Sequence, residues 1–118
     1  VITVDHCTIN GVSNTSGKRL LYVRNACSKI VWSNNIVTNT VGVWSNQAST
    51  TAPEFANNVY NACTNLNTEV LGPPIVNAFK DASGKVADPK YKDAAKGDFT
   101  IGEESVKKLQ VGAAKWYE

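Results

Sequence analysis

The sequence contains no methionine and only one histidine, His6, among its 118 residues. Because no methionine and no charged, apolar leader precede the strand-like run at residues 1–4, we expect the chain to start at a cut inside or just before a strand. The sequence also lacks a run of about 18 apolar residues. We therefore expect no membrane-spanning segment.

The net charge is small and cysteines are few. The formal net charge is +2 and the charges are spread along the chain, which argues against the basic patch of a nucleic-acid-binding protein. The three cysteines, Cys7, Cys27 and Cys63, have neither zinc nor redox spacing, and at most one disulfide can join two of them. We expect buried thiols, with no metal and no cofactor. At this length the chain has room for one modest core.

The composition changes near residue 79. Residues 1–79 contain 13 asparagines and seven charged residues, whereas residues 80–118 contain no asparagine and 15 charged residues. Gly72-Pro73-Pro74 lies just before the change and is typical of a turn or linker. We therefore predict a first part at 1–79 and a charged C-terminal segment of the same domain at 80–118.

The first part is repetitive. Segments 4–10, 32–39 and 55–61 share a large apolar residue, polar residues, a second apolar residue and a nearby asparagine. Their alignment places His6, Asn34 and Asn57 in one column, at intervals of 34 − 6 = 28 and 57 − 34 = 23 residues. Asparagine tolerates the positive φ of sharp turns and can hydrogen-bond along a stack of turns. The pattern therefore predicts stacked turns.

This pattern favours an all-β fold, a right-handed parallel β-helix of about three short coils with an irregular or helical capping tail. Strands stacked in parallel need apolar interior columns. Two such columns are predicted: Val4, Trp32 and Phe55, and Ile9, Val37 and Tyr60. An antiparallel sandwich is the competing fold, since short strands with frequent turns also suit it.

The tail carries a family resemblance. It reads Asp88-Pro89-Lys90-Tyr91-Lys92-Asp93, then Gly97-Asp98-Phe99, and ends near Gly112-Ala113-Ala114-Lys115-Trp116. These motifs resemble the closing segment of secreted, pectate-lyase-like β-helix proteins, in particular surface proteins of Bacteroidetes-type gut bacteria with no assigned function. The usual form has Asp-Pro-Arg in the middle, which this sequence lacks. The resemblance implies a secreted or cell-surface location and no particular activity.

Both ends of such a stack of coils are exposed. A polar-faced cap is needed at the C-terminal end, and the apolar residues expected to plug it are Phe99, Ile101, Val106, Leu109 and Trp116. The charges around Val106 predict a short helical turn there. At the other end, either upstream coils pair with the Val1 edge or a second copy does so by self-association.

The predicted binding residues are Tyr22, Arg24 and Trp44. If Leu21, Val23, Val41 and Val43 point inward, the two aromatic residues point outward on neighbouring coils. Together with Arg24 they would form a platform for a sugar ring; the alternative is that a loop or the tail covers them. Lys18, Arg19 and Arg24 can contact an anionic sugar, although solvated surface cations are the commoner case.

No complete catalytic constellation is present. His6 is the only candidate base, and Asp5 is expected to point to the opposite face of the strand, so His6 is interpreted as a turn residue. The repeat region has only Asp5, Glu54 and Glu69 as carboxylates, too few for a calcium-assisted lyase site.

The first functional hypothesis is a non-catalytic secreted or surface module that contacts polysaccharide. The alternatives are the C-terminal part of a polysaccharide lyase or glycosidase with upstream catalytic coils, and a structural or adhesive stacking module. We lean against an enzyme for this chain by itself.

Overall fold

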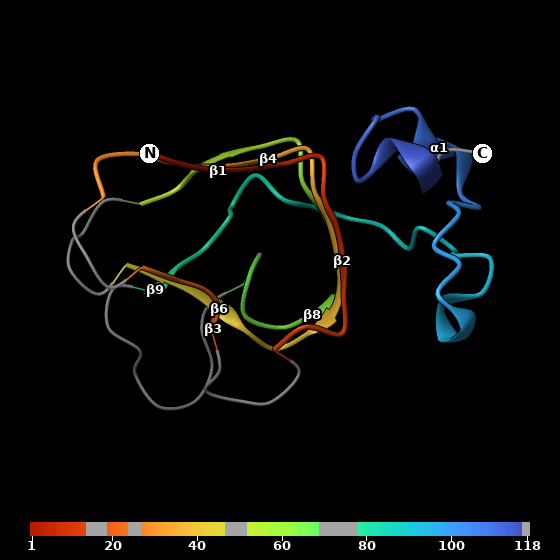
Figure 1. Ribbon diagram of the computed structural model, residues 1–118, viewed down its shortest axis with the longest axis horizontal. Helices are drawn as coiled ribbons and strands as arrows, with labels where there is room; N and C mark the ends of the chain where they lie inside the picture. Colours follow the sequence, from red (N-terminus) through yellow and green to blue (C-terminus); the bar gives the residue numbers. More distant parts are fainter. Residues whose placement is uncertain (14–18, 24–26, 47–51, 69–77, 117–118) are drawn as a thin grey trace.

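A computed structural model describes residues 1–13, 19–23, 27–46, 52–68 and 78–116. These residues form a mostly β structure with three small sheets that make the three sides of a triangle (Figure 1). The first sheet contains β1 (Ile2–Asp5), β4 (Ile30–Ser33) and β7 (Glu54–Ala56). The second contains β2 (Thr8–Asn10), β5 (Ile36–Thr40), β8 (Val59–Cys63) and β10 (Lys85–Val86). The third contains β3 (Arg19–Val23), β6 (Val43–Asn46) and β9 (Ala78–Phe79).

The chain visits the three sheets in turn and then returns to the first. We call each such pass a rung: β1, β2 and β3 make rung 1; β4, β5 and β6 make rung 2; β7 and β8 belong to rung 3. Rungs pair in parallel, and among the strands of the described ranges only β6 and β9 pair antiparallel. This pairing contradicts the antiparallel sandwich.

Both predicted interior columns are confirmed by the strand register. In the first sheet Val4 pairs with Trp32, which pairs with Phe55. In the second sheet the aligned residues are Ile9, Val37 and Tyr60. The prediction succeeds because large apolar side chains at equivalent positions of successive rungs must occupy one interior.

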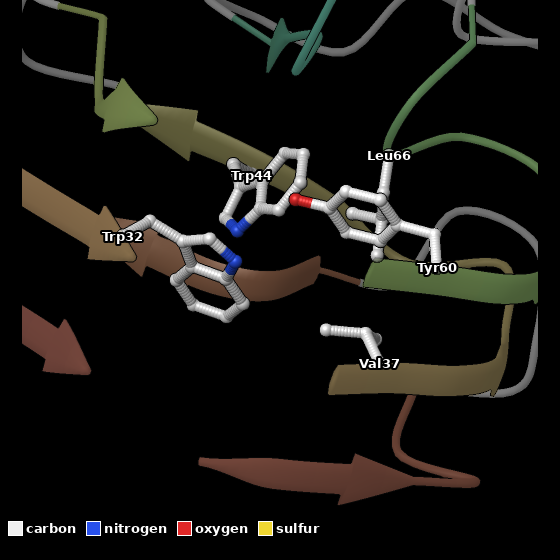
Figure 2. Close-up of a cluster of buried hydrophobic side chains, with 5 residues drawn as sticks. All are labelled: Trp32, Val37, Trp44, Tyr60 and Leu66. Carbon is white, nitrogen blue, oxygen red and sulfur yellow. The ribbon is translucent and has the colours of Figure 1, made fainter. Parts of the chain in front are cut away.

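The interior is built around Trp44, whose expected outward position is wrong. Its side chain is fully buried, and its ring centroid lies 5.2 Å from that of Trp32, 4.8 Å from Phe55 and 5.9 Å from Tyr60. Figure 2 shows Trp44 and Tyr60 pointing into the same space. Residues 41 and 42 precede β6, so the alternation counted from Val41 does not apply within the strand. Trp44 instead pairs with inward-facing Leu21.

A buried column of polar side chains supports the turn between the first two sheets. Asn35 Oδ1 accepts from the Cys7 amide at 2.8 Å, and Asn58 Oδ1 accepts from the Asn35 amide at 3.0 Å. Asn58 Nδ2 and the Tyr60 hydroxyl both donate to Asp81 Oδ2, at 3.1 and 2.7 Å. Burial first, and then the hydrogen bond to Asp81, raises the pKa of the Tyr60 hydroxyl. Each otherwise unpaired turn group thereby has a partner.

The tail contains η1 (Ala94–Lys96), α1 (Glu104–Lys107) and η2 (Ala114–Trp116). It lies outside the triangle, beside the second sheet, where Figure 1 shows it in blue. Four of the residues expected to plug the end of the stack, Ile101, Val106, Leu109 and Trp116, instead pack with the outward side chains of this sheet, Ile36 and Val59. The fifth, Phe99, lies against Tyr91 and Trp116, with ring centroids 5.2 and 5.6 Å apart. α1 falls where the order of charges predicted a helical turn, and Glu103 accepts a hydrogen bond from the Ser105 amide at its start.

The tail is also joined to the rungs by hydrogen bonds. The Gly112 amide donates to the Asn34 carbonyl at 2.7 Å, and Asn57 Nδ2 donates to the Leu109 carbonyl at 3.0 Å. The Ala113 amide donates to Thr8 Oγ1 at 2.9 Å. One segment of the tail therefore spans all three rungs at one corner.

Trp44→Ala is expected to lower the free energy of unfolding by about 3–5 kcal/mol, because it empties the centre of the aromatic cluster. Urea unfolding followed by circular dichroism measures this loss. Val86→Ala, at a side chain that is 72% exposed, is the control and should change stability by less than about 0.5 kcal/mol. Similar stabilities for the two variants would contradict the central position of Trp44.

Gly112→Ala is expected to weaken the docking of the tail. Gly112 has φ +75°, and an added Cβ would lie 2.7 Å from Thr8 Oγ1 and 2.9 Å from Ile36 Cδ1. Gly97 has φ +79° with no atom within 4 Å of an added Cβ, so Gly97→Ala reproduces the backbone strain without the clash. Strain alone costs about 1–2 kcal/mol. Gly112→Ala should lose about 1–3 kcal/mol more and expose the tail to protease; equal losses would refute tight docking at Gly112.

Candidate functional site

The outer face of the third sheet carries Arg19, Tyr22 and Ser45. Tyr22 is 42% exposed, and the Arg19 Cζ lies 4.3 Å from the centroid of its ring. Arg19 Nε donates to Ser45 Oγ at 3.1 Å, and Ser45 is the register partner of Tyr22 on β6. The guanidinium is therefore held over the aromatic ring on this face.

A register shift in β3 creates this arrangement. Residues three apart in a regular strand point to opposite faces of the sheet. Between Arg19 and Leu21 the pairing of β3 with β6 shifts, so Arg19 pairs with Val43 and Tyr22 with Ser45, two positions apart on the same face.

Of the predicted binding residues, Tyr22 is exposed, Trp44 is fully buried and Arg24 lies outside the described residues. The expected platform of outward Tyr22 and Trp44 is therefore not formed. Arg19, named in the sequence only as one of several basic residues, is the cation that contacts the Tyr22 ring. Contact with a sugar at this face stays a prediction.

A second polar cluster lies at the corner between β1 and β2. His6, Asn34 and Asn57 have φ of 52°, 55° and 53°, so the predicted column of turn residues is confirmed. Asn57 Nδ2 donates to Asn34 Oδ1 at 2.9 Å, and Asn34 Nδ2 donates to Asp5 Oδ1 at 2.8 Å. Lys85 Nζ donates to Asn57 Oδ1 at 3.3 Å. The amide dipoles thus run in one direction, from a cation toward a carboxylate.

Asp5 and His6 form a pair, and the expectation that they point apart is wrong. The positive φ of His6 ends the strand alternation, and Nδ1 of His6 lies 2.7 Å from Asp5 Oδ2. Ser33 Oγ donates to Asp5 Oδ1 at 2.8 Å. Hydrogen bonds from Asn34, His6 and Ser33 lower the pKa of Asp5 to about 2, so this carboxylate is ionised at neutral pH.

The Asp5–His6 pair orients an imidazole but does not form a Ser-His-Asp relay. Ser33 bonds to the carboxylate and not to the imidazole, so His6 is not placed to take its proton. Within the described ranges no three His, Cys, Asp or Glu side chains are grouped to hold a metal ion. The three cysteines are free thiols, each only half-buried.

The chain belongs to a family described as a domain of unknown function (DUF5123), whose model matches residues 2–116. No curated protein and no solved structure matches the chain. None of the described helices is long and apolar enough to cross a membrane.

Asp5→Asn is expected to lower the free energy of unfolding at pH 7, and the difference from the original protein should disappear in acid. The folded-state pKa of about 2 lies below the ordinary value of 3.8, so the stabilisation is present above pH 3.8 and is lost as the pH falls to about 2. Because the side chain is 41% exposed, the effect should be on the order of 1 kcal/mol or less.

Thermal unfolding of both proteins across this pH range measures the difference. Glu54→Gln on the same sheet is the matched control, since the Glu54 carboxylate has only a 3.7 Å contact with Lys29. An NMR titration midpoint near 3.8 for the Asp5 carboxyl would show that these hydrogen bonds do not hold it.

Proposed function

We propose that this DUF5123 domain is a non-catalytic module of a secreted or surface-displayed protein, built as a right-handed parallel β-helix, and that its partner is a polysaccharide. The observation that carries the proposal is the exposed Tyr22 ring beside the Arg19 guanidinium on an outer sheet face.

The β-helix proposal is supported by the order of the strands. Each strand of rung 2 pairs in parallel with the equivalent strand of rung 1, and two strands of rung 3 do the same on rung 2. Connections between parallel strands of one sheet are right-handed in nearly all proteins. The resemblance of the tail to pectate-lyase-like proteins supports the same fold and an extracellular location.

The polysaccharide proposal is supported by the chemistry of the outer face of the third sheet. Aromatic rings offer a flat apolar surface to the C–H groups of a sugar, and a tyrosine also has a polar end. The ring of Tyr22 is exposed, whereas the interior aromatics Trp32, Trp44 and Tyr60 are not.

The open edge of rung 1 favours a second candidate function, stacking. Within the described part of the chain β1, β2 and β3 each pair on one side only, and the side chains of Val4, Ile9 and Leu21 are only partly buried. Unpaired strand edges are templates for further strands. If two copies associate through this edge, the domain is a structural or adhesive module. If catalytic coils of a polysaccharide lyase or glycosidase stack on the same edge, the domain is part of an enzyme.

Tyr22→Ala is expected to weaken polysaccharide binding about tenfold, since stacking on an exposed ring contributes about 1 kcal/mol or more. Tyr22→Phe keeps the ring and should bind within about twofold of the original protein. Affinity electrophoresis against acidic and neutral polysaccharides, followed by calorimetry, measures these affinities. Val86→Ala is an exposed control outside this face. Binding of no polysaccharide by the original protein, or unchanged binding by Tyr22→Ala, would reject the proposal.

A further inference from the structure

We propose that Arg19 is an anion receptor, and that the ligand of the outer face of the third sheet is an acidic glycan whose carboxylate or sulfate group binds the Arg19 guanidinium. This inference rests on the proposed function and adds to it the class of ligand.

The guanidinium is immobilised before any ligand binds. Nε of Arg19 donates to Ser45 Oγ at 3.1 Å, and Cζ lies 4.3 Å from the centroid of the Tyr22 ring. Ser45 is itself buried on a central strand, so its hydroxyl is a fixed acceptor. A long side chain normally loses rotamer entropy when it binds a ligand. Much of that loss has already occurred here, which favours binding.

The positive charge of Arg19 has no acidic partner within the described residues. The acids of the described ion pairs are bound to other groups: Asp5 to His6, Glu54 to Lys29, Glu103 to Lys90, and Asp93 to Lys96. Arg19 instead contacts a neutral hydroxyl and an aromatic ring. A half-buried cation with neutral neighbours gains most from an incoming anion, because little water and no carboxylate compete with it.

The atoms that remain for a ligand have the right shape for an oxyanion. With Nε bonded to Ser45, the two terminal nitrogens of the guanidinium present parallel N–H groups. Such a pair matches the two oxygens of a carboxylate or a sulfate, whereas an ammonium presents a point charge. Since Cζ is 4.3 Å from the ring centroid, an anion bound there lies within reach of the Tyr22 side chain. A sugar that carries the anion can contact both residues.

The test compares one polymer in two charge states. The original protein is titrated by calorimetry with a polyuronate and with the same polyuronate after methyl esterification, which removes the charge and keeps the sugar. We expect about tenfold tighter binding to the charged form, with a preference that shrinks as salt is added. Sulfated and neutral glycans of equal length then show whether sulfate serves as well as carboxylate.

Arg19→Gln should abolish the preference while leaving binding to the esterified polymer within about twofold, and Arg19→Lys should restore only part of it. Lys29→Gln removes the same charge from a position just before β4 and should keep the preference. Circular dichroism confirms that the variants are folded. If Arg19→Gln does not fold, the two-polymer comparison on the original protein still tests the class of ligand, and Arg19→Lys tests the role of Arg19.

Equal affinity of the original protein for both polymers would overturn the inference, as would a preference that survives in Arg19→Gln. In that case loss of binding in Tyr22→Ala would still support the proposed function. Binding of neither polymer, nor of the sulfated and neutral glycans, would reject the proposed function as well.

Discussion

The turn at the corner of the first two sheets sets the register on which the structure depends. His6, Asn34 and Asn57 all adopt positive φ there, and the next residue of each rung enters the buried polar column. A slip of one residue would place these turns in strands and move every interior side chain to the outside. The aromatic interior and the outer faces are consequences of this one aligned turn.

The columns could be predicted from the sequence because residue type and spacing alone determine them. Val4, Trp32 and Phe55 are large and apolar at equivalent places, and parallel pairing in this register brings all three to the same interior. The position of the tail could not be predicted in this way. Ile36 and Val59 are apolar on the outward face, and a sequence does not show whether such residues meet solvent or a segment more than 40 residues further along the chain (101 − 59 = 42).

The candidate site shows a second limit of prediction from the sequence, the assumption that strand side chains alternate strictly between the two faces. Counting by twos grouped Tyr22 with Arg24 and did not bring Arg19 to the same face, but the register shift between Arg19 and Leu21 places it there. The same counting separated Asp5 from His6, whereas the turn brings them to 2.7 Å. The asparagine column already predicted a turn at His6. Both polar contacts therefore depend on a place where the alternation of strand side chains is interrupted, by a register shift in β3 and by a turn at His6.

The bond between the Ala113 amide and the Thr8 hydroxyl joins residues 105 positions apart in the sequence. The tail reaches the first rung only where the second and third are also in place, since it bonds to Asn34 and Asn57 on the way. Closing so long a loop is slow and comes after local strand pairing. The tail is synthesised after the three rungs and thus joins strands made long before it, and a chain with a misplaced rung gives it no continuous surface to join.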